Sequence, residues 1–168
     1  MTLIEQNVSR LEAVLLAEEE LYVRLRSVLQ REETELIGLE VRVLEETVEE
    51  KRSLAEEAQL LEESRVIVAR ALADALGLPS DTVKLSLIVE AAGESGTRLV
   101  SLYHRLKALI TSTESLLVSN ERFAHRSLSR VQETLRMLGQ TVPTESGYGP
   151  GSRRESVTGS GRLVRQAI

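Results

Sequence analysis

Few side chains in this sequence are of the types that bind metals. It holds two histidines, His104 and His125, and no cysteine, so a metal site would need carboxylate ligands. A di-iron helical bundle uses a Glu-x-x-His pair on each of two helices. The nearest feature here, Glu121 with His125, is spaced four residues apart and is not repeated. We therefore expect neither a metal site nor a cofactor.

Nucleophilic and phosphate-binding motifs are equally sparse. The sequence lacks a G-x-S-x-G turn, and its only aspartates are Asp74 and Asp81. The sequence therefore gives little support for a Ser-His-Asp catalytic triad. Three closely spaced glycines, Gly147, Gly149 and Gly151, follow no strand that could place them against a phosphate. We expect a protein without enzymatic activity.

The glutamate runs 18–20, 45–46 and 49–50 allow two interpretations. They could bind a cation, or they could be helix-forming residues on solvated faces. Arg24 and Lys51 lie nearby at helical spacing, which favours the second interpretation.

Composition favours a helical protein. Of the 168 residues, 42% are apolar and 28% charged, and only 2% are aromatic. Long helices and coiled coils use such residues, whereas sheets need more aromatic and β-branched ones. Residues 1–79 carry 18 acidic and nine basic side chains, and residues 80–168 carry eight and twelve. This modest asymmetry, without a dense basic stripe or stacking aromatics, argues against nucleic-acid binding.

The same composition bears on the compartment. The absence of cysteine removes any dependence on an oxidising environment. No apolar run approaches the roughly 18 residues that a membrane span needs, and the first residues lack the pattern of a signal peptide. We expect a cytoplasmic protein that is not embedded in a membrane.

Apolar spacing predicts a first long helix over residues 2–37. Thr2 and Glu5 form a capping-box pattern at its start. A second apolar line at Val14, Leu21 and Val28 widens the face, which favours packing against two neighbours over a two-stranded rod. The main line steps alternately by three and four residues through Val8, Leu11, Leu15, Glu18, Tyr22, Leu25, Leu29, Glu32 and Leu36.

Glycine and proline divide the rest of the chain. A reversal at Gly38 precedes a second helix over 39–76, which ends at Gly77 and Pro79. A short helix over 81–92, capped by Ser80 or Asp81, leads through a glycine-containing joint to a third long helix over 97–138. Residues 1–138 therefore form an all-α, elongated antiparallel bundle, and we expect 139–168 to be a flexible tail.

The third long helix has an irregular apolar pattern. Its line steps by three and four residues and then slips by one. The line runs through Leu99, Leu102, Leu106, Leu109, Thr113, Leu116, Asn120 and Phe123 and continues after the slip at Ala124, Leu128, Val131, Leu135 and Leu138. Such a helix cannot bury every apolar side chain against one fixed pair of neighbours. Its distal part should therefore expose a groove for an amphipathic partner helix. Asn120 either fixes register as a satisfied core residue or takes part in binding, and Tyr148 is either inert or an anchor for recognition.

In their order, several segments resemble the FlgN family of flagellar type III export chaperones. These are the Leu- and Glu-rich segment 11–21, the break near Gly38, the segment 44–54 with its Lys and Leu spacing, and 116–123 with an Asn before a hydrophobic residue. The fifth is Tyr-Gly-Pro-Gly at 148–151, similar to the Tyr-Gly-x-x-Gly of many members. The sequence departs from the family pattern at Ala55, where a second Leu is usual, and in the last motif, which closes one residue early.

The resemblance implies a cytosolic chaperone that binds the hook–filament junction proteins FlgK and FlgL. It also implies delivery of these clients to the flagellar export gate or its ATPase components. The alternative is a structural or adaptor coiled coil that homodimerises through its first helix, and the sequence leaves homodimer formation open. By resemblance, the client-binding residues lie in the last helix and the tail: Leu116, Leu117, Asn120, Phe123, Leu128, Val131, Leu135, Leu138 and Tyr148.

Overall fold

The computed structural model describes residues 2–79 and 84–138, and every element in them is helical. The expectation of an all-α fold is therefore confirmed. The side chain of Ser95 and the expected caps Ser80 and Asp81 lie outside the described residues, as does the tail over 139–168. The elements are α1 (Leu3–Gly38), α2 (Val41–Ala75), α3 (Leu85–Ala91), the 3₁₀ turn η1 (Gly93–Gly96) and α4 (Thr97–Met137).

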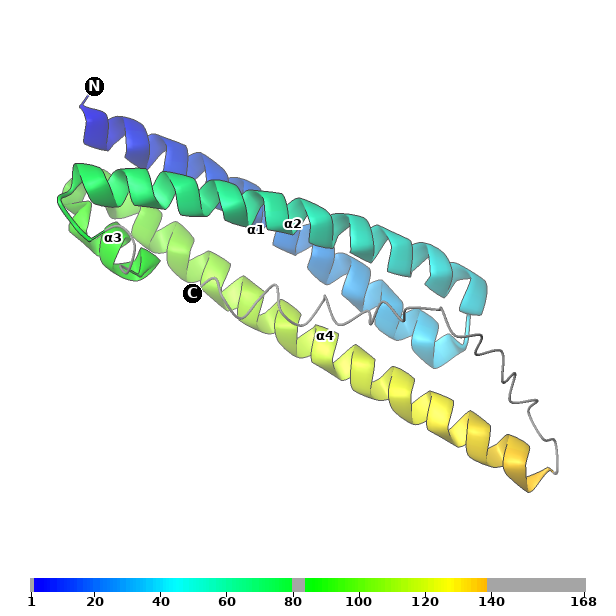
Figure 1. Ribbon diagram of the computed structural model, residues 1–168. Helices are drawn as coiled ribbons and strands as arrows, with labels where there is room; N and C mark the ends of the chain where they lie inside the picture. The colour runs from blue at the N-terminus through cyan, green and yellow to red at the C-terminus, as the bar shows by residue number, and fades with distance from the viewer. Residues whose placement is uncertain (1, 80–83, 139–168) are drawn as a thin grey trace, which may run out of the picture.

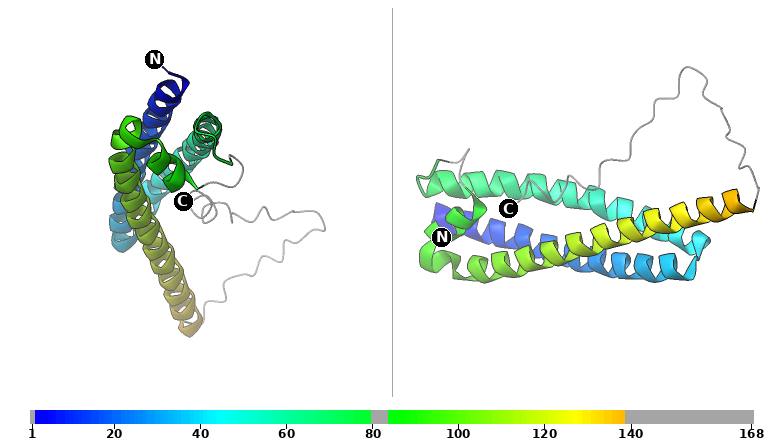
Figure 2. Two further views of the ribbon diagram at one scale, coloured as in Figure 1. Left: turned by 90° about the vertical axis from the view of Figure 1, so that its left-hand side faces the viewer. Right: turned by 90° about the horizontal axis from the view of Figure 1, so that it is seen from below.

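α1 lies between the other two long helices and packs against both (Figures 1 and 2). α2 runs back alongside α1, whereas α4 runs in the same direction as α1. Within the described part of the chain, α2 and α4 do not approach each other closely. The wide apolar face of α1 explains this arrangement, because Leu21 and Val28 are buried together with the main line of apolar residues.

The start of α1 has the predicted capping box. The Thr2 hydroxyl accepts from the Glu5 backbone N–H at 3.2 Å, and a Glu5 carboxylate oxygen accepts from the Thr2 N–H at 2.7 Å. The end of α1 differs from expectation. Gly38 is the last helical residue, and Leu39 takes the left-handed conformation, with φ of 56°. Hydrogen bonds from the Leu39 and Glu40 N–H groups to the Glu35 carbonyl hold this turn in place.

The end of α2 follows the glycine mechanism. Gly77 has φ of 71°, and the Leu78 N–H donates to the Ala73 carbonyl at 2.9 Å, as in a Schellman motif. Leu78 folds back onto the core. The joint between α3 and α4 requires glycine at two positions. Gly93 has φ of 58°, and a Cβ at Gly96 would lie 2.6 Å from the Ala92 Cβ.

We call the end that holds the start of α1, the end of α2 and α3 the proximal end. Its core consists of closely packed aliphatic residues contributed by all four helices. α3 lies across this end and contacts both α2 and α4. The residues with 3% exposure or less are Leu11, Leu15, Leu72, Ala73, Ile88, Val89, Leu99 and Leu102.

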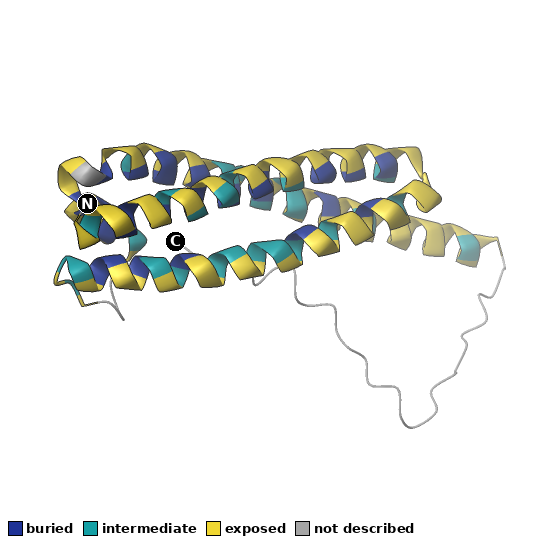
Figure 3. Ribbon diagram, turned by 90° about the horizontal axis from the view of Figure 1, so that it is seen from above, coloured by how far each residue is buried: buried dark blue, intermediate teal, exposed yellow. Residues whose placement is uncertain are grey.

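The distal end comprises the α1–α2 turn and the second half of α4. Its buried residues include Glu32, Glu35, Thr47 and Asn120, so polar groups take the place of leucines. Figure 3 shows that exposed residues dominate the last part of α4, whereas buried and exposed positions alternate over the rest of the molecule.

Candidate functional site

The second half of α4 diverges from α1, and its last turns continue beyond the α1–α2 turn (Figures 1 and 2). We call residues 121–138 the distal arm. Five large apolar side chains of the arm are exposed: Phe123 by 40%, Leu128 by 56%, Val131 by 50%, Met137 by 78% and Leu138 by 68%. The expectation that the distal part of this helix exposes apolar residues is confirmed.

The physical reason for this exposure differs from the predicted one. Most of the predicted line of α4 is buried, including Leu106, Thr113 and Asn120, and Ile110 is buried beside it. Leu109 and Leu116 of that line are half-buried, and Phe123 is exposed. At about 3.6 residues per turn, this face continues without a slip through the arm stripe, which consists of Ala124, Leu128, Val131, Leu135 and Leu138. The arm stripe is therefore core-type surface on a stretch of helix that diverges from α1 and then extends past the α1–α2 turn.

Apart from Asn120, the expected binding residues fall into three groups. Phe123, Leu128, Val131 and Leu138 are exposed on the arm, and Leu135 is half-buried there. Leu116 and Leu117 are half-buried in the bundle next to the arm. Tyr148 lies outside the described residues.

Asn120 has a structural position instead of a surface one. Its amide donates to the Leu29 carbonyl at 2.8 Å and to a Glu32 carboxylate oxygen at 2.9 Å. The other Glu32 oxygen accepts from Lys51 of α2 at 2.5 Å. Glu32, Lys51 and Asn120, which we call the polar clamp, thus join all three long helices just before the arm begins. The interpretation of Asn120 as a satisfied core residue fits this geometry better than a direct binding role.

A second group of exposed apolar residues lies at the α1–α2 turn. Ile37, Leu39 and Val41 are each at least 64% exposed, and Val43 is 41% exposed. The sequence analysis missed these residues, although four aliphatic side chains around a chain reversal were a readable signal. Together with the arm, they concentrate exposed apolar surface at the distal end.

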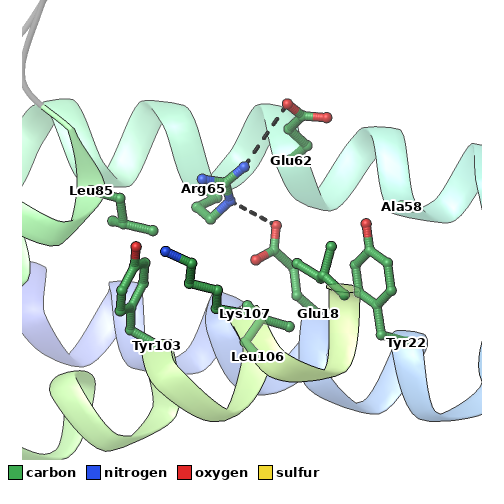
Figure 4. A pocket seen from close by; sticks show the side chains of 10 residues that line it. Glu18, Tyr22, Ala58, Glu62, Arg65, Leu85, Tyr103, Leu106 and Lys107 are labelled. Carbon is green, nitrogen blue, oxygen red and sulfur yellow. Dashed lines mark hydrogen bonds and ion pairs between the residues drawn. The ribbon is translucent and has the colours of Figure 1, made fainter. Parts of the chain in front are cut away.

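A pocket lies between α2 and α4 above α1, midway along the molecule (Figure 4). In it Arg65 donates to Glu18 at 2.9 Å, and both side chains are almost fully buried. Glu18 was expected on a solvated face, which is wrong because it occupies a core position of α1 opposite an arginine of α2. Burial raises the pKa of Glu18 although Arg65 opposes the shift. Burial, aided by the charges of Glu18 and Glu62, raises the pKa of the Tyr22 hydroxyl to about 12.

This pocket has no recognisable catalytic arrangement. Its acidic groups already contact Arg65, and its other lining includes Leu106, Ile110 and Leu85. Across residues 2–79 and 84–138, no three His, Asp or Glu side chains come together as metal ligands would. No helix in this part of the chain is long and apolar enough to cross a membrane.

Comparisons with known proteins give one family. The family model described as FlgN protein matches residues 1–156 of this chain, which includes both ends of the bundle and the arm. Neither the curated proteins nor the solved structures contain a match.

Proposed function

This chain belongs to the FlgN family, and we propose that it is the cytosolic chaperone of the hook–filament junction proteins FlgK and FlgL. FlgN is a family of flagellar export chaperones, which generally lack enzymatic activity. In this proposal the protein holds its clients before export and passes them to the flagellar export gate or its ATPase components. Bound clients cannot assemble prematurely because their terminal helices are covered.

The observation that carries the proposal is the exposed arm stripe. It repeats apolar residues at three- and four-residue steps, the spacing of a coiled-coil seam. The positions that flank the seam are His125, Ser127, Gln132 and Thr134, so no fixed charge restricts the choice of partner helix. A surface of this kind suits the amphipathic terminal helices of more than one client.

The client would pack along the arm with Leu128, Val131, Leu135 and Leu138 in the seam. Phe123 and the half-buried Leu116 and Leu117 would form the edge nearest the bundle. Asn120 would act indirectly, by fixing α4 on α1. Tyr148, beyond the described residues, would add a contact from the tail to the client or to the export apparatus.

Energetics favour reversible binding. A fully buried Leu or Val side chain contributes about 1.5–3 kcal/mol. Much of the sum is offset by the loss of translational freedom and by the ordering of side chains and tail. Release at the export apparatus then requires no covalent step.

The test is calorimetric titration of purified FlgK and FlgL from the same organism into the full-length protein. Leu135→Asp combined with Leu138→Asp should weaken binding at least about tenfold, because charged residues would enter the apolar seam. Circular dichroism should remain nearly unchanged. A matched control is Leu16→Asp combined with Leu60→Asp, at exposed leucines of α1 and α2.

Two results would contradict the proposal. One is loss of helicity in the arm variant, which would place Leu135 and Leu138 in the core. The other is equal affinity of the arm variant and the control variant for both clients. If neither client binds and the wild-type protein forms a stable dimer in light scattering, the structural coiled coil replaces the chaperone.

A further inference from the structure

The side of the arm away from its apolar stripe carries a line of arginines. Arg122, Arg126 and Arg130 are spaced four residues apart and are all exposed, and we call them the basic ridge. At about 3.6 residues per turn, Arg122 and Arg126 lie roughly opposite the arm stripe and Arg130 lies to one side. A client helix seated on the stripe would therefore leave the ridge open to solvent.

The ridge differs from the arginines of the bundle in its alignment. Some bundle arginines reach across to glutamates of a neighbouring helix, as Arg24 does to Glu57 at 2.6 Å and Arg105 to Glu19 at 2.8 Å. Others, such as Arg10, Arg70 and Arg98, are exposed, but each lies on a different helix. Among the described residues, no ridge arginine forms an ion pair. Like charges at four-residue spacing destabilise a helix slightly. Favourable interaction with the helix dipole is limited to the last turn, which holds Arg136 and not the ridge.

We propose that the basic ridge is a second docking surface, which binds an acidic helical segment of a protein other than the client. Arginine suits this role because its planar guanidinium pairs with carboxylates in a bidentate manner. Three arginines in line match a helix that carries Glu or Asp at the same four-residue spacing. The arm would then hold a client on one side and the acidic partner on the other.

The geometry favours such a partner over the other anionic surfaces. An anionic membrane would be contacted most strongly by a helix whose basic residues flank its apolar face, whereas Arg122 and Arg126 point away from the stripe. Single-stranded nucleic acid would require several stacking aromatics, and Phe123 is the only Phe, Tyr or Trp of the arm.

A second copy of this chain is also disfavoured. Its exposed acidic residues on α2, such as Glu45, Glu46 and Glu49, could meet the ridge. That contact would join two different surfaces, and unless the copies closed into a ring it would continue into an open-ended polymer.

The test uses the full-length protein and two synthetic helical peptides of identical composition. One peptide carries three Glu residues at four-residue spacing on one face, and the other distributes them around the helix. Fluorescence anisotropy should show about tenfold tighter binding of the first peptide. This preference should weaken as ionic strength rises, because exposed ion pairs are screened.

Charge-reversal variants distinguish the effect of the ridge on peptide binding from the effect of net charge. Arg122→Glu, Arg126→Glu and Arg130→Glu together should abolish peptide binding. The control variant changes the net charge equally at exposed positions of the bundle, with Arg10→Glu, Arg70→Glu and Arg98→Glu. It should retain most of the peptide binding. The ridge variant should still bind FlgK, so failure here is distinguishable from failure of the client site.

Several results would overturn the proposal. These are equal affinity for the two peptides, equal losses in the two triple variants, or tighter binding to phosphatidylglycerol vesicles or to single-stranded DNA than to the first peptide. Concentration-dependent polymerisation that the ridge variant abolishes would assign the ridge to a second copy instead.

Discussion

The two ends of this molecule bury different kinds of residue. At the proximal end, leucines such as Leu15, Leu72 and Leu99 have no exposed surface, and α3 covers the space between α2 and α4. At the distal end, the buried positions include Glu32, Glu35 and Asn120, while apolar residues of the arm and the turn are exposed. The difference indicates that the proximal end stabilises the fold, whereas the distal end leaves apolar surface exposed.

Buried polar atoms without hydrogen-bond partners add to this difference. At the distal end, Asn120 Oδ1 and Glu35 Oε2 are buried and have no hydrogen-bond partner among the described residues. Each such group costs about 1–3 kcal/mol. The distal end therefore has less net stabilisation than its buried area suggests, and its helices should separate at lower free energy than the proximal ones.

The largest expected effect is in the proximal core. Leu72→Ala should lower the free energy of unfolding by about 2–5 kcal/mol, because a fully buried side chain is lost and a cavity remains. Leu128→Ala, at an exposed position of the arm, should change it by at most about 0.5 kcal/mol. Urea unfolding followed by circular dichroism compares the two variants. Similar losses in both would remove the distinction between the ends.

In the pocket midway between the ends, the raised pKa of Tyr22 predicts that the free energy of unfolding falls at alkaline pH. The pKa of Tyr22 is raised to about 12, above its ordinary value of 10, so its neutral form is favoured in the folded state. This contribution to stability is fully present below pH 10 and is lost as the pH rises through 12. The loss should reach about 2–3 kcal/mol. Tyr22→Phe should remove that part of the pH dependence in urea unfolding between about pH 9 and 12. An unchanged profile would contradict a raised pKa of the Tyr22 hydroxyl.

The polar clamp should contribute less than the proximal core. Lys51→Met leaves the buried Glu32 carboxylate without its charged partner and should cost about 1–3 kcal/mol. This is below the cost for a fully buried pair because Lys51 is partly exposed. Adding Glu32→Gln should restore part of the loss in urea unfolding. If Lys51→Met alone has no effect, the clamp does not hold the distal end together.

The smallest expected effect is at the α1–α2 turn. Leu39 has φ of 56° and is 72% exposed, so it is strained and contributes little packing. Leu39→Gly should stabilise the protein by about 1 kcal/mol, since glycine adopts this conformation without strain. Thermal unfolding measures the gain. A loss of stability would show that the Leu39 side chain packs usefully at the turn.

Local sequence signals predicted the helix ends better than they predicted the core. The capping box at Thr2 and the glycine stop at Gly77 depend on a few neighbouring residues, and both formed as expected. Leu39 was not foreseen as the left-handed residue, because a glycine directly before it is the usual choice. The turn is instead held by the Leu39 and Glu40 N–H groups, which both donate to the Glu35 carbonyl.

Buried charge was the part of the core that sequence could not reveal. Glu18 and Glu32 interrupt the apolar line of α1, and within a glutamate run Glu18 resembles a solvated residue. Only the tertiary structure brings Arg65 and Lys51 of α2 opposite them. Exposure of the arm was foreseen, but its cause was not, because the path of α4 relative to α1 and α2 is a property of the assembled fold.

The most direct measurement is hydrogen exchange of the full-length protein with and without FlgK, followed by mass spectrometry. The account predicts slow exchange at the proximal end in both samples and faster exchange in residues 121–138 of the free protein. Addition of FlgK should protect 121–138 and leave the segment from Leu11 to Leu21 unchanged. Protection confined to the proximal end, or an arm that already exchanges as slowly as the core without FlgK, would contradict it.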